Sequence, residues 1–171
     1  AYGVVNTPDY RSKNPNGLVP LLEDGDFTLW ESNAIVRYLC AREGSALYPQ
    51  DIRQRFDAER WMDWQQTELN PASGPAFKQW IRTPAEQRSP QVIAASVAAT
   101  EPKFQQLDEH LSRHAFMAGD ALSMADIPIA CEVHRWWGLP QPRPAWPNLE
   151  RWYAQWLSLP ASRGVLDLPL S

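Results

Sequence analysis

The sequence predicts a mixed α and β protein that is mainly α-helical, and two observations carry this prediction. An Asp24-Gly25 turn separates two short apolar runs, at residues 18–23 and 27–30, which is the pattern of a β-hairpin. From residue 51 onward, apolar residues recur at helical spacing in several long segments. We therefore expect a hairpin and a helix at the amino-terminal end, followed by an all-helical domain.

The segment around the hairpin contains further start and stop signals. Thr7 followed by proline is typical of a helix start, so residues 8–13 are expected to form a short helix. The Asn-Pro-Asn-Gly sequence at residues 14–17 has the composition of a turn. After the hairpin, Ser32 is the expected N-cap of a helix, and Gly44 is the residue type that typically follows a helix end.

A two-stranded hairpin is barely stable alone, and each of its strands has an unpaired edge. The apolar run at residues 18–23 would have only one strand as partner. We therefore expect a strand–helix–strand unit, which needs roughly 30 or more residues, to precede Ala1. The expected domains are residues 1–44 and 50–171.

The second domain is expected to be built from helices alone. Proline is disfavoured in helix interiors, so the sixteen prolines, Pro71 and Pro102 among them, are expected to mark element boundaries. The helices predicted from apolar spacing and from these boundaries are 51–69, 89–114, 123–137 and 147–157, with an irregular tail from Pro160.

Composition excludes several classes of function. The 171 residues are 44% hydrophobic, which is enough to form a core. The net charge is −4 without a basic cluster, so we expect no nucleic-acid partner. The apolar stretches are too short to span a membrane. Cys40 and Cys131 lie far apart within helical patterns, so we expect both to be buried thiols of a reducing, cytoplasmic compartment.

Two stretches of sequence carry a resemblance to a known family. They are NPNGLVP at residues 14–20 together with LWESNAI at 29–35, and GDALSMAD at 119–126. The chain resembles the cytosolic glutathione S-transferases, most of all their bacterial, theta- and beta-like branches. The resemblance implies a thioredoxin-like N-terminal domain, here only in part, and an all-α C-terminal domain. It also implies that the Val19–Pro20 peptide bond is cis.

The resemblance implies that glutathione binds to Val19, Pro20, Glu31, Ser32 and Asn33. Free N–H groups in the first turn of a helix can bind the γ-glutamyl carboxylate, with Ser32 beside it and Glu31 on the ammonium group. An outward-facing Val19 backbone could pair with the cysteinyl part of glutathione in strand fashion. From the residues alone, a plain helix cap and a strand-end proline without any ligand remain the alternatives.

The activity implied by the resemblance is detoxifying transfer of glutathione to a small electrophile. Such an enzyme lowers the pKa of the glutathione thiol so that the thiolate attacks a bound electrophile. In the family, the Tyr, Ser or Cys that does so lies at the end of the first strand or the start of the first helix. We therefore expect the catalytic residue upstream of Ala1, because Tyr2 comes too late. The alternatives are a non-catalytic interaction module and a glutathione-dependent reductase or lyase.

The resemblance also suggests where the electrophile would bind. The later part of the first long helix and the next helix line that pocket in the family, which makes Gln65, Gln66, Phe77 and Trp80 candidates for the pocket or for a dimer interface. A homodimer is expected from the family and from helices rich in tryptophan, of which the chain has nine.

Two further patterns have a structural interpretation. Ser123 and Asp126 form a Ser-x-x-Asp capping box, which we expect to stabilise a helix start. His110 and His114 have a spacing that could bind a metal, but convincing further ligands are lacking nearby. We therefore expect a solvated face there and no metal. The resemblance implies glutathione as a co-substrate.

Overall fold

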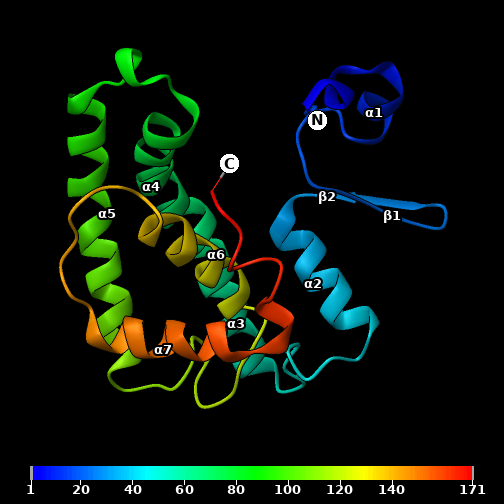
Figure 1. Cartoon of the computed structure of the whole chain (residues 1–171). Helices are drawn as coiled ribbons and strands as arrows, with labels where there is room; N and C mark the ends of the chain where they lie inside the picture. Colours follow the sequence, from blue (N-terminus) through cyan, green and yellow to red (C-terminus); the bar gives the residue numbers. More distant parts are fainter. Residues whose placement is uncertain (1, 171) are drawn as a thin grey trace. The chain divides into compact units, whose positions relative to one another are not determined.

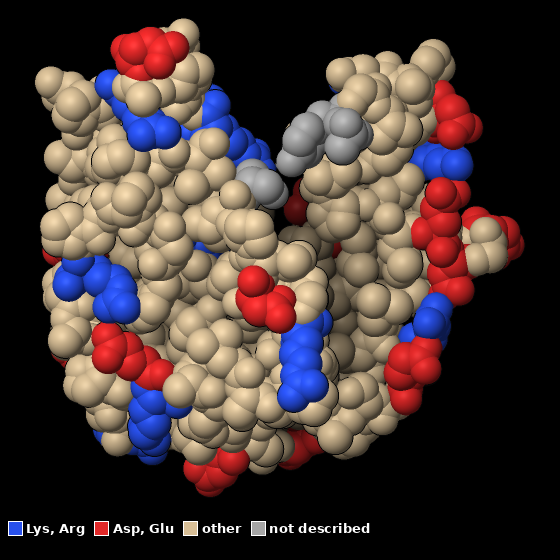
Figure 2. Space-filling model, viewed as in Figure 1, with Lys and Arg blue, Asp and Glu red and all other residues tan. Residues whose placement is uncertain are grey.

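The computed structural model describes residues 2–170, with side chains from residue 3 (Figure 1). The chain divides into two compact units, residues 1–48 (unit 1) and residues 49–171 (unit 2). Helices dominate, and the described residues contain a single two-stranded sheet. Basic and acidic side chains are interspersed on the face seen in Figure 2. In the part of the chain that is described, no helix combines the length and apolar character that crossing a membrane would need.

Unit 1 contains the hairpin that the Asp-Gly turn predicted. Its elements in order are η1 (Tyr2–Asn6), α1 (Pro8–Lys13), β1 (Leu21–Asp24), β2 (Phe27–Trp30) and α2 (Ser32–Arg42). The strands are antiparallel, and their register runs from Leu21 opposite Trp30 to Asp24 opposite Phe27. The turn needs a positive φ of 63° at Gly25, which glycine adopts without steric cost. The first strand begins three residues later than expected, just after Pro20, which cannot donate to a ladder.

The ends of the helices in unit 1 are fixed by local signals. Thr7 caps α1, because its hydroxyl accepts a hydrogen bond from the Tyr10 amide at 3.3 Å, as the sequence predicted. Gly44 follows α2 with φ 60°, and the next amide, of Ser45, donates to the Cys40 carbonyl at 3.0 Å. Together these contacts form a glycine-ended helix stop of the Schellman type.

The hairpin is joined to α2 through the carboxylate of Asp24. The Tyr38 hydroxyl donates to Asp24 Oδ2 at 2.6 Å, and the Arg42 guanidinium pairs with the same oxygen. The hydrogen bond from Tyr38 and, next, that from Arg42 hold the pKa of the Asp24 carboxyl below its usual range. These contacts tie the turn end of the hairpin to the last turns of α2.

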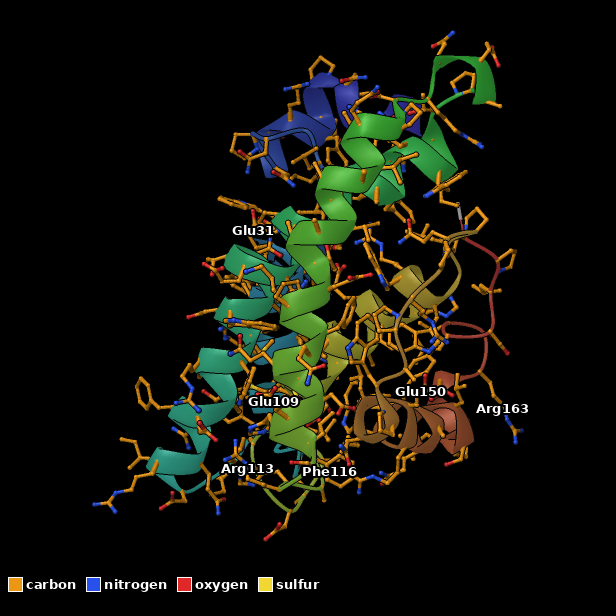
Figure 3. All side chains as sticks on the ribbon, turned by 90° about the vertical axis from the view of Figure 1, so that its left-hand side faces the viewer. Glu31, Glu109, Arg113, Phe116, Glu150 and Arg163 are labelled. Carbon is orange, nitrogen blue, oxygen red and sulfur yellow. The ribbon has the colours of Figure 1, made fainter. Side chains whose placement is uncertain are left out.

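Unit 2 is helical throughout its regular segments. Its elements are α3 (Ile52–Trp64), η2 (Gln65–Leu69), α4 (Asn70–Phe77), η3 (Lys78–Arg82), η4 (Ala85–Gln87), α5 (Pro90–Leu111), α6 (Asp126–Trp137), α7 (Pro147–Ser158) and η5 (Pro160–Ser162). The segments η2 and η3 are π-helical, so α3 to η3 form one continuous run. Figure 3 shows α5 with Glu109 and Arg113 near its C-terminal end, and Phe116 in the loop beyond.

The expectation that Pro71 ends a helix is wrong. The helix continues past it, because Pro71 is the second residue of α4 and follows the π-helical turn η2. Pro75 lies inside α4, and Pro102 lies inside α5. A π-helical turn loosens the regular ladder of hydrogen bonds, which lets a proline follow without the usual clash.

A side chain from α5 completes the hydrogen bonding of α4. The Ala76 amide, which in a regular helix would donate to the Ala72 carbonyl, donates instead to Ser96 Oγ at 3.1 Å. The Ser96 hydroxyl in turn donates to the Ala72 carbonyl. The hydroxyl is thus inserted into the α4 ladder, and it satisfies two buried backbone groups at once.

The start of α7 is also capped from α5. Asp108 Oδ1 accepts hydrogen bonds from the amides of Asn148 at 2.7 Å and Leu149 at 2.9 Å. These are two of the N–H groups that a helix start leaves without an intrahelical partner. The core around this contact is strongly aromatic. Its fully buried members include Phe104, Leu107, Leu111, Trp146, Leu149 and Trp152.

Two expectations about single side chains in unit 2 are wrong. His110 does not lie on a solvated face: its ring is half-buried, 4.7 Å from the Trp61 ring and 4.5 Å from the His114 ring. Burial and, next, the nearby charge of His114 lower the pKa of His110. Cys131 is exposed on α6, whereas Cys40 is buried as expected. Helical periodicity shows which residues share a face, but not how fully that face is covered.

Candidate functional site

The loop that leads into the hairpin is held by two side chains on one carbonyl. The Tyr10 hydroxyl and the Asn14 side-chain amide each donate to the Leu18 carbonyl at 2.7 Å. Asn14 is only 2% exposed, and its Oδ1 accepts the Asn16 amide at 3.1 Å. The Asn-Pro-Asn-Gly turn that the sequence predicted therefore also fixes the backbone that immediately precedes Val19.

Gly17 makes this loop possible. Its φ is 61°, and a Cβ at this position would lie 2.8 Å from the guanidinium carbon of Arg11. Arg11 is itself held by a hydrogen bond from its guanidinium to Asn6 Oδ1 at 3.2 Å. The positive φ favours glycine, and a Cβ would also lie 3.1 Å from the Val5 carbonyl oxygen, so the path of the loop is tightly specified.

The Val19–Pro20 peptide bond is cis, as the resemblance implied. Val19 is 60% exposed and lies outside the β1–β2 ladder, whose first pair is Leu21 and Trp30. Neither the N–H nor the C=O of Val19 has a hydrogen-bond partner among residues 2–170. An extended ligand could therefore pair with the Val19 backbone as an added strand would.

Glu31 has the one non-glycine backbone with a positive φ among the described residues, at φ 74° and ψ 114°. This conformation turns the chain from β2 into α2 within a single residue. Such sparsely populated conformations cost of order 1–3 kcal/mol and cluster at ligand clamps and active sites. The outlier therefore marks this position as a candidate binding site.

Ser32 is not the N-cap of α2, which corrects the expectation from sequence. Glu31 occupies the cap position: its carbonyl accepts the first helical hydrogen bond, from Ile35 at 2.9 Å, and Ser32 is the first helical residue. The reason is the positive φ at Glu31, which begins the helix one residue early. The side chain of Glu31 makes no capping hydrogen bond, and the first turn has no acidic residue. The helix start can therefore accept an anion from outside the chain.

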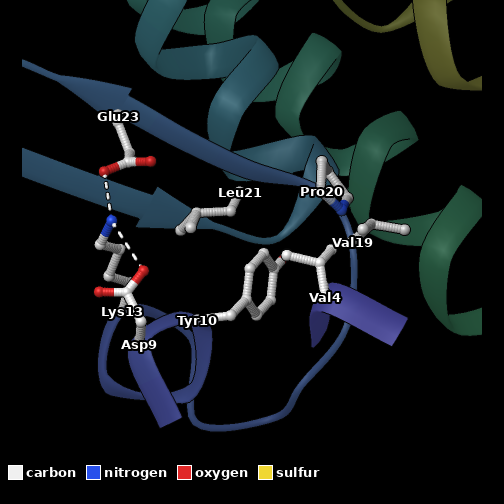
Figure 4. A pocket seen from close by; sticks show the side chains of 8 residues that line it. All are labelled: Val4, Asp9, Tyr10, Lys13, Val19, Pro20, Leu21 and Glu23. Atoms are coloured by element: carbon white, nitrogen blue, oxygen red, sulfur yellow. Dashed lines mark ion pairs between the residues drawn. The ribbon is translucent and has the colours of Figure 1, made fainter. Parts of the chain in front are cut away.

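A cavity of about 480 Å³ lies beside Val19 and Pro20 within unit 1 (Figure 4). Its polar end holds Lys13, whose ammonium lies 2.9 Å from Glu23 and 3.6 Å from Asp9. The contact with Glu23 is the main cause that raises the pKa of Lys13. The remaining lining residues are Val4, Tyr10 and Leu21.

The structure separates the four candidates for the electrophile pocket. Gln65 is buried and its Nε2 lies 3.4 Å from Glu132 Oε1, whereas Gln66 is exposed. Trp80 is half-buried, and its Nε1 donates to Gln141 Oε1 at 2.9 Å. Phe77 lines a cavity of about 240 Å³ within unit 2.

Two family models match the chain. The model for the glutathione S-transferase N-terminal domain matches residues 2–41, and the model for the C-terminal domain matches residues 90–155. Glutathione S-transferase GstB of Escherichia coli (strain K12) is 39% identical over 173 residues, which cover 99% of this chain and 83% of that protein. The chain belongs to the glutathione S-transferase family.

A solved transferase structure is similar over the whole chain. The theta class glutathione S-transferase of the citrus canker pathogen Xanthomonas axonopodis pv. citri, with glutathione bound, is 38% identical, with a TM-score of 0.96. The match covers 100% of this chain and 83% of that one. It confirms the fold class expected for this transferase: a thioredoxin-like N-terminal domain and a helical C-terminal domain.

A relative with a different name shares much of the same sequence. Elongation factor 1-gamma 1 of Oryza sativa subsp. japonica is 32% identical over 137 residues, which cover 77% of this transferase and 32% of that protein. Because proteins with different names share this scaffold, function has to be argued from the site of this transferase.

Sequence reasoning missed several residues that shape the candidate sites of this transferase. Tyr10 and Asn14, which hold the Leu18 carbonyl, gave no signal beyond a helix and a turn. Glu132 and Arg135 are three apart on α6 and form an ion pair at 2.9 Å, a spacing that could have drawn attention to them. Arg82 ends a π-helical segment that no sequence pattern indicated.

Proposed function

We propose that this transferase holds glutathione on unit 1 and transfers the glutathionyl group, through its sulfur, to a small electrophile. The observation that carries the proposal is the start of α2, where Glu31 takes a positive φ in the cap position and its side chain makes no capping hydrogen bond. A strained helix start beside an exposed strand-like peptide at Val19 is suited to a short peptide ligand.

The two ends of an α-amino acid match the groups at this position. The γ-glutamyl carboxylate of glutathione would accept hydrogen bonds from the Ser32 hydroxyl and from the first amides of α2. The carboxylate of Glu31 would pair with the adjacent ammonium group. The cysteinyl part would pair with the N–H and C=O of Val19, as an added strand.

Transfer requires the thiolate form of glutathione. A hydrogen bond to sulfur favours the thiolate, which then forms a bond to the electrophilic carbon. We assign this hydrogen bond to none of residues 2–170. What unit 1 contributes is orientation, because a peptide held at three points presents its thiol in one place.

The test is calorimetric titration with glutathione. Ser32→Ala should weaken binding about tenfold, which is the effect of one lost hydrogen bond to a charged group. The matched control is Ser12→Ala, since Ser12 is exposed and its hydroxyl contacts only the Asp9 carbonyl, at 2.7 Å. Wild type and the control should bind glutathione equally.

Absence of glutathione binding to wild type would overturn the proposal. The non-catalytic interaction module would then be the better interpretation, in line with the similarity to elongation factor 1-gamma 1. Equal binding by wild type and Ser32→Ala would remove the helix start from the site.

We further propose a cytoplasmic homodimer that acts in detoxification. A partner surface is supported by Ile52 and Phe56, which are 63% and 66% exposed and lie one helical turn apart on α3. Large apolar side chains gathered on one exposed helix face are typical of interaction sites.

A further inference from the structure

The cavity in unit 2 combines apolar walls with positive charge. Its volume is about 240 Å³, larger than the cavity of about 150 Å³ that can hold benzene. The lining residues are Phe77, Arg82, His134, Arg135, Val165, Leu168, Pro169 and Leu170. Two of these eight are arginines, and none is a carboxylate.

Both guanidinium groups lie close to the ring of Phe77. The guanidinium carbon of Arg135 is 4.4 Å from the ring centroid, and that of Arg82 is 5.3 Å from it. At these distances the ring attracts each cation and limits where it can move. The ring and the two arginines therefore form one assembled face of the cavity.

The charge of Arg135 is balanced by the carboxylate of Glu132, which is not among the lining residues. This carboxylate is 4% exposed, lies 2.9 Å from the Arg135 guanidinium, and accepts a hydrogen bond from Ser73 Oγ at 2.9 Å. Arg82 has no ion pair with any residue in the described chain, so the cavity keeps an excess of positive charge. Glu132 acts on the cavity only by positioning Arg135.

The third basic side chain of the lining, that of His134, contacts the C-terminal tail. His134 Nδ1 lies 3.1 Å from the Tyr153 hydroxyl, and Nε2 lies 3.1 Å from the Leu168 carbonyl. The tail segment that forms the far wall of the cavity is thereby attached to α6 and α7. Arg82 also ends the π-helical segment η3, and π-helical turns are frequent at functional sites.

We propose that this cavity selects electrophiles that carry a carboxylate on an apolar body. The carboxylate would bind the guanidinium of Arg82 in the forked geometry that arginine favours, with Arg135 beside it. The apolar body would contact Phe77 and the tail. This inference rests on the proposed function, because it names the substrate class of the same transferase.

A matched pair of substrates tests the selectivity: 4-chloro-3,5-dinitrobenzoate and its neutral methyl ester. In both, the glutathione sulfur forms a bond to the ring carbon that bears chlorine. The carbon–chlorine bond breaks, chloride leaves with the electron pair, and the thiol proton passes to solvent. The ester lacks the charge that Arg82 would meet, and its different size and intrinsic reactivity are the same for every variant, so they cancel when variants are compared.

The measured quantity is the ratio of kcat/KM for the acid to kcat/KM for the ester. Arg82→Gln should lower this ratio about tenfold relative to wild type. The substitution Arg82→Lys keeps the charge but loses the forked hydrogen-bonding geometry of arginine. Its ratio should therefore lie between those of wild type and Arg82→Gln. The control is Arg113→Gln, just beyond the C-terminal end of α5 (Figure 3), which should keep the wild-type ratio.

Arg135→Gln needs a second measurement, because it leaves the buried Glu132 with fewer partners. Its melting curve should be recorded first, and a folded variant should also show a lowered ratio. A ratio that Arg82→Gln leaves unchanged would overturn the inference, while turnover of the ester would still support a transferase.

If wild type conjugates neither substrate, a binding measurement tests the carboxylate site without catalysis. The probe is then 3,5-dinitrobenzoate, which lacks a leaving group, titrated calorimetrically into wild type and Arg82→Gln. Weaker binding by the variant would support the cavity as a carboxylate site even though the proposed function had failed. Equal binding, or none, would overturn it.

Discussion

The carboxylate of Asp126 joins separate parts of unit 2 at a single buried point. Its Oδ1 accepts hydrogen bonds from the Met117 amide at 2.9 Å and from Trp152 Nε1 at 3.0 Å. Its Oδ2 accepts the Ser123 amide at 2.9 Å and the Ser123 hydroxyl at 3.0 Å. Burial raises the pKa of Asp126, and these hydrogen bonds act in the opposite direction.

Asp126→Ala should destabilise the protein strongly. The substitution leaves buried N–H groups of Met117, Ser123 and Trp152 without an acceptor, and we expect a loss of about 3 kcal/mol. The melting temperature should fall by roughly 10 °C, measured by circular dichroism. Asp120→Ala, at an exposed position nearby, should leave the curve unchanged. Similar curves for both variants would refute the structural role.

Only some of the hydrogen bonds of the Asp126 carboxylate could be predicted from the sequence. The Ser-x-x-Asp spacing indicated the contact between Ser123 and Asp126, because it is local in sequence. The expected helix start at Ser123 is wrong, because α6 begins at Asp126 with Ala125 in the cap position. The contacts with Met117 and Trp152 depend on how α6 packs against α7 and against the loop after α5. Nothing in a local motif encodes such packing.

At the scale of elements, the continuous run from α3 to η3 shows why proline misled the prediction. A proline is costly in a helix when its missing hydrogen bond is not replaced and its ring clashes with the preceding turn. Here π-helical turns loosen the backbone at both ends of α4, and the Ser96 hydroxyl from α5 bonds the Ala76 amide and the Ala72 carbonyl, which are next to the two prolines of α4. The hairpin, α5 and α7 were predictable because their signals are local.

Ser96→Ala should weaken the packing of α4 against α5. Without the hydroxyl, the Ala76 amide and the Ala72 carbonyl lose their shared partner in a buried region, which should cost about 2 kcal/mol. Chemical denaturation in urea measures the loss. Ser112→Ala is the control, because that residue is exposed at the end of α5. A loss no greater than that of the control would mean that the α4 ladder closes without the hydroxyl.

The residues of the candidate sites also divide into those that local sequence signals could indicate and those that they could not. Val19, Glu31 and Ser32 were named from short motifs, and the structure places each at an exposed backbone or helix start. Arg82 and Arg135 could not be named, because their cavity also needs a tail without regular structure and a π-helical turn. Sequence patterns give neither the path of such a tail nor the angular shift that a π-helical turn introduces.

At the scale of the whole molecule, the sequence predicted the fold class because each unit has its own pattern. Two short apolar runs around an Asp-Gly turn differ from long helical periodicities, so the two regions are distinct before any packing is known. The boundary at residues 48–49 falls at Tyr48-Pro49, within the connector that follows Gly44.

The proposed homodimer gives a further prediction. Phe56→Glu places a charge on the exposed apolar face of α3, so the dimer should dissociate at micromolar concentration, as measured by analytical ultracentrifugation. Leu157→Glu, on an exposed position of α7, should remain dimeric. A monomeric wild type would contradict the homodimer, and a dimeric Phe56→Glu would place its interface elsewhere.

At Glu31, the requirements of stability and of the proposed ligand binding differ. A glycine would adopt φ 74° without strain, so selection for a robust fold alone would favour glycine there. The proposed contact between the Glu31 carboxylate and the ammonium group of glutathione would account for a residue other than glycine at this position. Efforts to make the protein more heat-resistant should leave this residue untouched, because the stabilising exchange is also the one that would remove its charge.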